Sequence, residues 1–496
     1  MMSEAKEPKL SARSASAPGF VAVVAVLVLT EIVSAFELSM MYVTLPTLMA
    51  DFHVDANAVA WVVTIYLLVS ASAALLGGRF GDLYGRRRVM VVVLALAAIG
   101  SLISLVGSSL EMIILGRGIQ GAAGAVMGLA FGLAREHLEE KRLPVGVSMI
   151  GASALIAGAG GALIAGLMID TFSWHGIFLF AGVLAVLAVI AVLVVLPRDK
   201  PRATTAGRLD IAGALLLPMG ASGVLLGLSN SSKAGWASLE GGGLLLGGLV
   251  VVAVWVWWEL HCHRPIVNLQ MFKNRQIALA MAATFLAAVG PIGGMAVPSQ
   301  YVLQYPAEMG FGLGFSATAA GLFSGGTALL GYLFSPLGGK LAQAFNARFV
   351  FITGLLLMLA AVAAIMFFLG NLLVFLVAMS VNSVGIALTF GALPNVLIEA
   401  VPETHTSESA GTNTMVRNIG QSVATAVGAY LLARHQDPVT TAVGEQGVFE
   451  AFGFVAIFGL AALVLAFMLS RTPKVWVPQD AAMQLPKQAE PADDLV

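Results

Sequence analysis

The sequence predicts an all-α integral membrane protein with fourteen transmembrane spans, arranged as two six-helix bundles with two extra transmembrane helices between them. Three observations support this fold class: an apolar composition, a one-sided distribution of Lys and Arg, and a short internal repeat. Of the 496 residues, 58% are hydrophobic and 11% are charged. Soluble domains have about 45–50% apolar and about 25% charged residues. The net charge of −1 offers no general attraction for nucleic acid.

The candidate spans are apolar segments of about 20 residues, the length that crosses the hydrocarbon core. Pro and Gly punctuate the breaks between them, as in LPRDKPRATTAGR and QYPAEMGFGLGF. A twelve-span alternative, with two interfacial helices within 209–260, is weaker because both segments are too apolar. The predicted spans are 20–48, 58–78, 89–107, 110–134, 146–168, 176–196, 209–229, 241–260, 277–304, 316–336, 349–369, 371–398, 411–433 and 449–470.

Lys and Arg separate cleanly around these spans. An even number of spans places both termini on one side, and 22 of the 26 Lys and Arg residues lie in segments on that side. The opposite loops hold Lys233 and Arg434, while Arg117 and Arg417 fall within spans. Because cytoplasmic loops are enriched in Lys and Arg, we expect a multi-pass protein of the bacterial cytoplasmic (inner) membrane with both termini in the cytoplasm. The first span follows a polar segment without a clear cleavage site, so we expect it to be retained.

A short repeat relates the two halves. GGRFGDLYGRR (77–87) and GGKLAQAFNAR (338–348) share a Gly-Gly-basic start, an aromatic residue and a final Arg. Each links the second and third spans of a six-span unit, which is the plan of transporters built from repeated halves. We therefore expect a cytoplasmic tail, a first bundle, a linker with two spans, a second bundle and a cytoplasmic tail, at 1–19, 20–196, 197–276, 277–470 and 471–496.

Four motifs resemble those of the fourteen-span drug:proton antiporter branch of the major facilitator superfamily, over about residues 20–470. They are the loop 77–87, LGRGIQGAAGA (115–125), the Gly-rich segment GASALIAGAGGALIAG (151–166) and FELSMMYVTLP (36–46). The chain departs from the family at Leu83, where a basic residue is usual, and at Ala162, where proline is usual. The matching residues are Gly78, Asp82, Gly85, Arg86 and Arg87 in the loop, Arg117, Gln120 and Gly121 in the fourth span, Gly158, Gly161 and Gly166 in the fifth, and Glu37 in the first.

This resemblance implies a proton-coupled exporter of amphipathic or cationic compounds that works by alternating access, as a monomer and without a cofactor. It also implies a gate at the loop 77–87, where Asp82 pairs with an Arg or a helix N-terminus across the interface between the halves. Such a contact would stabilise the outward-open state and break in the inward-open state. In the second half Gln343 replaces the acid, so the gate is expected to be asymmetric.

Glu37 and Glu31 are the acidic residues of the first predicted span, where a charged side chain costs roughly 2.5–3.5 kcal/mol or more. Removal from water favours the neutral form of a carboxyl group, so such a group can exchange protons near neutral pH. Glu37 shares a helical stripe with Met40 and Met41, whose flexible side chains suit varied apolar ligands. We predict that Glu37 couples transport to protons. Glu31, about 240° around the helix, is a second candidate. The alternative is a carboxyl held in a fixed hydrogen bond or ion pair.

Arg117 remains cationic in the membrane and therefore needs a partner. We expect it to tune Glu37, although an Arg bonded only to main-chain carbonyls would simply hold helices together. Arg417 has the corresponding place in the second half. Asparagine and glutamine residues in later spans, including Gln300, Gln304 and Asn418, more often join helices than bind ligands. The candidate substrate contacts are Glu37, Met40, Met41, Tyr66, Gln120, Asn382 and Asn395.

Other function classes lack support in the sequence. An enzyme would need a paired nucleophile and base or a metal site, and neither pattern occurs; Cys262 is the only cysteine. His261 and His263 would point about 200° apart on a helix, which disfavours metal binding. No G-x-x-x-x-G-K-[ST] motif supports ATP as the energy source. A lipid or a metabolite made by the cell is the alternative substrate for the same machinery, and the expected partners remain a small molecule, protons and the bilayer.

Overall fold

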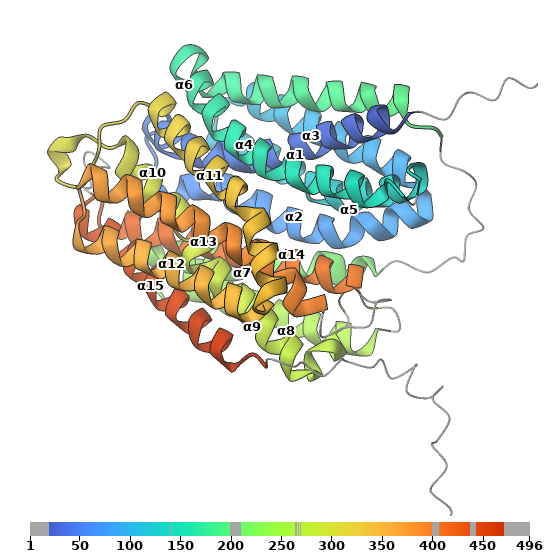
Figure 1. Ribbon diagram of the computed structural model, residues 1–496. Helices are drawn as coiled ribbons and strands as arrows, with labels where there is room; N and C mark the ends of the chain where they lie inside the picture. Colours follow the sequence, from blue (N-terminus) through green and yellow to red (C-terminus); the bar gives the residue numbers. More distant parts are fainter. Residues whose placement is uncertain are drawn as a thin grey trace, which may run out of the picture.

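The computed structural model describes residues 19–139, 141–198, 210–262, 265, 267, 269–398, 406–436 and 443–470. These residues are almost entirely helical. Figure 1 shows the long helices of the first half, in blue to teal, gathered in one part of the molecule, and those of the second half, in yellow to red, gathered in the other. The break at Gly85, with φ 95°, separates α2 from α3.

The first half begins with three helices that each match one predicted span. Its fourth predicted span is a continuous rod with a 3₁₀ turn, η1, in the middle. The fifth and sixth are one helix bent at Ser173, where φ is 60° and ψ 178°, between the two spans predicted from the sequence. The elements are α1 (Phe20–Phe52), α2 (Ala56–Tyr84), α3 (Arg86–Leu105), α4 (Leu110–Gln120), η1 (Gly121–Ala125), α5 (Val126–His137) and α6 (Leu143–Val195).

The linker and the second half follow the predicted spans equally closely. The linker contains α7 (Ile211–Ala234), η2 (Leu239–Gly243), α8 (Leu244–His261) and η3 (Leu269–Lys273). The helix predicted at 277–304 is interrupted by a π-helical turn, η4, which contains Pro291 and the non-helical Gly290. The second half contains α9 (Arg275–Ala287), η4 (Ala288–Ile292), α10 (Ala296–Gln304), η5 (Ala307–Met309), α11 (Ala317–Ala344), α12 (Ala347–Phe367), α13 (Leu372–Ile398), α14 (Thr406–Arg434) and α15 (Glu445–Met468).

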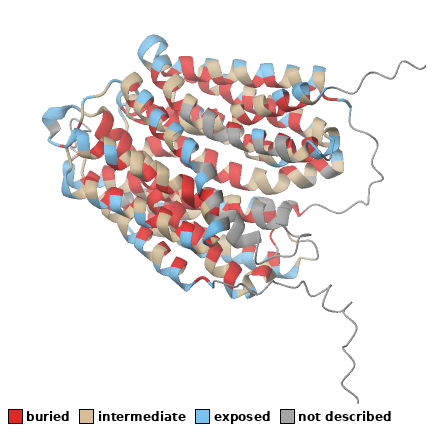
Figure 2. Cartoon of the chain, in the orientation of Figure 1, coloured by how far each residue is buried: buried red, intermediate tan, exposed pale blue. Residues whose placement is uncertain are grey.

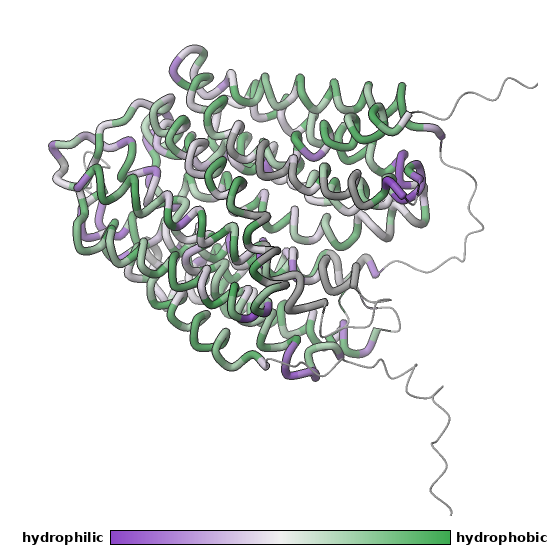
Figure 3. The backbone as a smooth tube through the Cα atoms, viewed as in Figure 1, coloured by the Kyte–Doolittle hydropathy of each residue, from purple (hydrophilic) through white to green (hydrophobic). Residues whose placement is uncertain are grey.

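The outer faces of these helices are apolar. Ten candidate spans in the described part of the chain are long and apolar enough to cross a membrane. Large apolar side chains such as Val194 and Leu373 are 77% and 71% exposed, although water would oppose this exposure. Figure 2 shows buried residues along the interior of the bundle, and Figure 3 shows hydrophilic residues collected near helix ends. The protein is therefore a multi-pass membrane protein whose outer surface faces lipid.

The two halves share one apolar core at one end of the bundle and have separate apolar clusters at the other end. We call the end where α2 meets α3 the basic end, because Arg86, Arg142, Arg275 and Arg348 lie at the helix termini there. Near this end each half has its own apolar cluster. Toward the opposite end one cluster combines residues of both halves, including Met49 of α1, Tyr301 of α10, Leu432 of α14 and Phe452 of α15. The halves are thus joined by a common core at the opposite end.

The linker helix α7 packs along the seam between α2 and α14. Leu225 of α7 clusters with Leu68 of α2 and Ala426 of α14. About two turns away, Leu217 joins a cluster with Ala71 and Met415 of the same two helices. The linker therefore contacts both halves instead of standing apart from the bundle.

Candidate functional site

Glu37 is enclosed in the middle of the first half. Its residue is 0% exposed, and neither carboxyl oxygen has a hydrogen-bond partner among the described residues. Glu31 is 4% exposed, and its Oε2 atom also has no hydrogen-bond partner among the described residues. An isolated carboxylate is costly in such surroundings, so burial favours the protonated form of both groups. Both acids of α1 are therefore buried, and neither oxygen of Glu37 is held in a fixed hydrogen bond within the described chain.

Arg117, in the last turn of α4, occupies the same interior as Glu37. Its Nε donates to the carbonyl of Val62 at 3.1 Å, and its Nη1 donates to Oε1 of Gln120 at 2.8 Å. The guanidinium carbon lies 4.2 Å from the ring centroid of Tyr66, within cation–π range. Nη2 has no partner among the described residues, although Arg117 and Glu37 interact electrostatically. Arg117 therefore holds α4 to α2 and also leaves one donor group available beside the buried acid.

Gln120 and Tyr66 extend this cluster to α3 and α1. Gln120 Nε2 donates to Ser101 Oγ at 2.7 Å, and the Ser101 hydroxyl donates to the carbonyl of Ala97 at 2.9 Å. The Tyr66 hydroxyl donates to the carbonyl of Ser34 at 3.1 Å. Gln120 is thus committed to contacts within the first half. Ser101 cannot be identified as part of this cluster from the sequence, because a lone serine in an apolar span carries no signal of its own.

The other predicted substrate contacts lie in different parts of the molecule. Met40 and Met41 are fully buried in the core that joins the halves. Asn382 is buried, with an Oδ1 atom that has no partner among the described residues. Asn395 lies in α13, but its side chain is outside the described part of the chain. Arg417 of α14 places its guanidinium carbon 4.9 Å from the ring centroid of Phe390.

Three amide side chains form helix–helix hydrogen bonds, which confirms the structural alternative for them. Asn418 Nδ2 donates to Ser70 Oγ at 3.3 Å, across the seam between α14 and α2. Gln304 Nε2 donates to the carbonyl of Val43 at 3.0 Å, between α10 and α1. Gln300 donates to Ser324 Oγ at 3.1 Å. Two of these three contacts join one half to the other.

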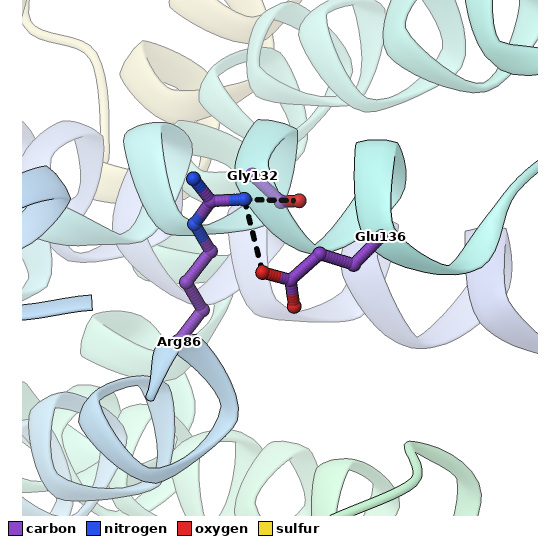
Figure 4. Close-up of polar contacts among 3 residues, drawn as sticks. All are labelled: Arg86, Gly132 and Glu136. Atoms are coloured by element: carbon purple, nitrogen blue, oxygen red, sulfur yellow. Dashed lines mark hydrogen bonds and ion pairs between the residues drawn. The ribbon is translucent and has the colours of Figure 1, made fainter. Parts of the chain in front are cut away.

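The basic loop is anchored within the first half. Arg86 Nη1 donates to the carbonyl of Gly132 at 2.9 Å and to Oε1 of Glu136 at 3.1 Å, as Figure 4 shows. Arg87 donates to the carbonyl of Leu193 at the end of α6. The Arg86–Glu136 pair is partly exposed, so it contributes about 0–1 kcal/mol and mainly positions the start of α3 against α5. Asp82 lies in helix α2, but its side chain is outside the described part of the chain.

The glycines of the loop motif have different roles. Gly85 has φ 95°, a conformation that favours glycine, and it forms the turn between α2 and α3. Gly78 is not a point of close helix approach in this conformation, because a Cβ there would meet no heavy atom within 4 Å. The close approach is one residue earlier, where a Cβ at Gly77 would lie 2.4 Å from the Cβ of Ala125. The helical rotation of α2 puts Gly77, not Gly78, against η1.

The glycines of α6 face two neighbours. A Cβ at Gly161 would lie 2.1 Å from Ser39 Oγ of α1, and one at Gly166 would lie 2.3 Å from the main-chain oxygen of Ala317 at the start of α11. Gly158 is open, with no heavy atom within 4 Å of a built Cβ. Near Gly166, Asp170 Oδ2 accepts from the Thr318 amide at 2.8 Å. The carboxylate of one half therefore caps a helix of the other half.

Comparison with known proteins agrees with this architecture. The family model described as Major Facilitator Superfamily matches residues 27–311 and 299–491. The structure of the nucleoside transporter NupG has a TM-score of 0.64 at 13% sequence identity, covering 89% of this chain and 99% of that one. At this identity the likeness shows the fold alone.

Several sequence relatives are exporters or resistance proteins by name. Multidrug resistance protein Stp of Mycobacterium tuberculosis is 27% identical over 404 residues, covering 79% of this chain and 72% of the relative. Lincomycin resistance protein LmrB of Listeria monocytogenes is 23% identical over 468 residues, covering 90% and 96%. Cephamycin export protein CmcT of Amycolatopsis lactamdurans is 31% identical over 290 residues, covering 58% of each chain. Since the family model spans most of the sequence, this chain belongs to the Major Facilitator Superfamily and is a membrane transporter, not an enzyme.

Proposed function

We propose that the protein is a proton-coupled antiporter that exports amphipathic or cationic drugs and toxic compounds by alternating access. The observation that carries the proposal is Glu37, a fully buried carboxyl without a hydrogen-bond partner among the described residues, in one interior cluster with Arg117. Such a carboxyl is stable when neutral and must meet water or a cation when charged. The names of the relatives, which include multidrug and lincomycin resistance proteins, support drugs as the substrate class.

The coupling follows because a proton and a cationic substrate compete for the carboxyl of Glu37. Protonated Glu37 is neutral and can be enclosed during the change between open states. Exposure to the cytoplasmic side lets the carboxyl release its proton, and the resulting charge attracts a cationic or polarised substrate. Exposure to the opposite side lets a proton displace the substrate. Glu31, the second buried acid of α1, is the candidate for a second proton.

The conformation supports alternating access between two packed halves. The common core and the contacts of Gln304, Tyr301 and Asp170 join the halves toward the end opposite the basic end. We infer that fourteen helices span the bilayer, that the basic end is cytoplasmic, and that this conformation is closed to the outside. In this arrangement residues 20–196 and 277–470 are the moving halves and residues 197–276 connect them.

Flux through purified protein tests the proposal. The protein is reconstituted into liposomes with an acidic lumen, and uptake of ethidium, a permanent lipophilic cation, is followed by fluorescence. Uptake against the ethidium gradient is expected while the pH difference lasts, and nigericin should abolish it. Protein-free liposomes are the control, because a permanent cation does not redistribute with pH by itself. Uptake that is indifferent to the pH gradient would refute proton coupling.

A second candidate substrate class is a metabolite made by the cell. The 31% identical relative named cephamycin export protein favours it. In this case ethidium and other foreign cations would not be moved, and loss of the gene would cause a native compound to accumulate inside the cell. Comparing metabolites retained by a deletion strain with those retained by the complemented strain separates the two candidates.

Cysteine labelling tests the orientation. In a Cys262→Ser background, Ala237→Cys should react with a membrane-impermeant maleimide in intact cells, whereas Glu139→Cys should react only after lysis. Both positions are exposed, so neither result depends on burial of the thiol. The excess of Lys and Arg at the basic end is the physical reason for this expectation. The reverse labelling pattern would overturn the orientation, and labelling of both positions from the same side would overturn the proposed count of spans.

The proposed gate is tested at Asp82. Asp82→Asn is expected to reduce ethidium flux by at least about tenfold, the change that a loss of about 1.4 kcal/mol in one conformation produces. Asp82→Glu should retain part of the activity because the charge survives. Glu139→Gln removes an exposed acid from the next basic-end loop and should leave flux unchanged. Parental flux in Asp82→Asn at equal expression would remove the gate from the mechanism.

A further inference from the structure

Tyr66 connects the buried cation to the helix that carries both buried acids. It is 2% exposed and lies in α2. Its ring faces the guanidinium of Arg117 at 4.2 Å, and its hydroxyl donates to the carbonyl of Ser34 at 3.1 Å. Ser34 stands three residues after Glu31 and three before Glu37. The hydroxyl therefore contacts α1 at the turn between the two acids.

Helix geometry brings this hydroxyl near the carboxyl of Glu37. Side chains in an α-helix lean toward its N-terminus, so that of Glu37 lies over the turn that contains Ser34. Both Glu37 and Glu31 lie within interaction range of Tyr66. Neither oxygen of Glu37 has a partner among the described residues. A donor group thus lies beside an acceptor group to which it is not bonded in this conformation.

The hydrogen bond from the Tyr66 hydroxyl to the Ser34 carbonyl can break without leaving that carbonyl unpaired. In an α-helix the carbonyl of residue 34 also accepts the main-chain amide four residues later. The departure of the Tyr66 hydroxyl therefore would not leave that carbonyl unpaired, and the hydroxyl can rotate to a better acceptor. A hydrogen bond to a charged carboxylate is stronger than one to a neutral carbonyl.

We propose that Tyr66 is a positioning residue for proton exchange: its ring holds Arg117 beside Glu37, and its hydroxyl turns from the Ser34 carbonyl to the Glu37 carboxylate when that carboxyl loses its proton. The inference rests on the proposed proton-coupled function. The proton passes between Glu37 and water, and Tyr66 keeps its own proton throughout. Among the described residues, the titratable or charged groups that act on this site are Glu31 and Tyr42 of α1 and Arg117 of α4.

The two parts of the side chain can be tested separately. Tyr66→Phe keeps the ring over Arg117 and removes the donor, whereas Tyr66→Leu removes both. Tyr301→Phe is the matched control, because Tyr301 is also fully buried and its hydroxyl donates to the sulfur of Met49, away from Glu37 and Arg117. The measurement is proton release on addition of ethidium to purified protein in weakly buffered detergent, as a function of pH. Ethidium counterflow without a pH gradient is measured beside it.

Loss of the donor destabilises the charged form of Glu37, so proton release in Tyr66→Phe is expected to move to higher pH by about one to two units. Counterflow in Tyr66→Phe should fall less than in Tyr66→Leu, because the ring over Arg117 is kept. Tyr66→Leu should also lose counterflow, since Arg117 loses its ring contact. Tyr301→Phe should retain the parental midpoint.

The outcomes separate this inference from the function on which it rests. If the parent releases protons, Glu37→Gln does not, and Tyr66→Phe has the parental midpoint, then the role of Tyr66 is wrong while proton coupling stands. Equal counterflow in Tyr66→Leu and Tyr66→Phe would overturn the role of the ring. If the parent releases no protons on ethidium binding, proton coupling itself fails and the role of Tyr66 falls with it.

Discussion

Glu37→Gln is expected to abolish uphill export while leaving the transporter folded. Gln has nearly the shape of a protonated Glu and can still form hydrogen bonds, but it cannot release a proton. Ethidium accumulation driven by a pH gradient should therefore fall to the level of protein-free liposomes. Affinity for ethidium should fall by about tenfold or more, because the counter-charge is lost in a water-poor interior. Counterflow of the neutral drug chloramphenicol should persist.

Two neighbouring variants sharpen this result. Glu37→Asp keeps a titratable carboxyl on a shorter side chain, so partial proton-driven uptake is expected. Glu31→Gln tests the second buried acid of α1 under the same conditions. The deciding measurement is proton release on ethidium binding in detergent. Should Glu37→Gln release protons as the parent does, the coupling site is elsewhere, and Glu31 becomes the first candidate.

Gly166→Ala is expected to reduce flux strongly although it adds a single methyl group. A Cβ at this position would lie 2.3 Å from the main-chain oxygen of Ala317 and 2.9 Å from the Cα atom of Thr318. Main-chain atoms cannot move aside alone, so α6 and α11 would have to separate. Overpacking of this kind costs about 1–3 kcal/mol. We therefore expect a loss of roughly 5- to 150-fold in the population of this closed conformation, with a corresponding loss of ethidium flux.

Gly158, in the same helix α6, provides the matched control for Gly166→Ala. Gly158→Ala introduces the same methyl group where no heavy atom lies within 4 Å, and flux should remain close to that of the parent. Gly321→Ala should reproduce the Gly166→Ala defect from the other side, because its Cβ would lie 2.3 Å from the main-chain oxygen of Ala162. Thermal unfolding in detergent shows whether a loss of flux reflects a loss of fold. Equal flux in Gly166→Ala and Gly158→Ala would show that this crossing does not limit transport.

The contact between α6 and α11 shows how the interface between the halves is built. Small residues let the main chains approach, and Thr318 donates through its hydroxyl to the carbonyl of Gly166 at 3.2 Å. Asp170 accepts from the amide of Thr318, near the positive end of α11. All these contacts lie toward the end opposite the basic end. They must break if the halves rock to open that end.

The helical architecture and the acids of the first span can be predicted from the amino-acid sequence. Each predicted span coincides with a helix or part of one, and even the bend at Ser173 falls between the spans 146–168 and 176–196. This success has a physical cause, because lipid requires long apolar segments whose main-chain groups bond internally. A carboxyl such as Glu37 stands out against this background since membrane burial is costly for charge.

The contacts between side chains became known from the packing of the helices. This packing placed Arg86 on Glu136 within its own half, set Gly77 of α2 against η1, and put Tyr66 between Arg117 and α1. The reason is that α1 and its neighbours are apolar on nearly every face, so periodicity does not reveal which face a helix turns toward which partner. A rotation of one residue, about 100°, changes every contact. That rotation follows from how whole helices pack, which lies beyond any single stretch of sequence.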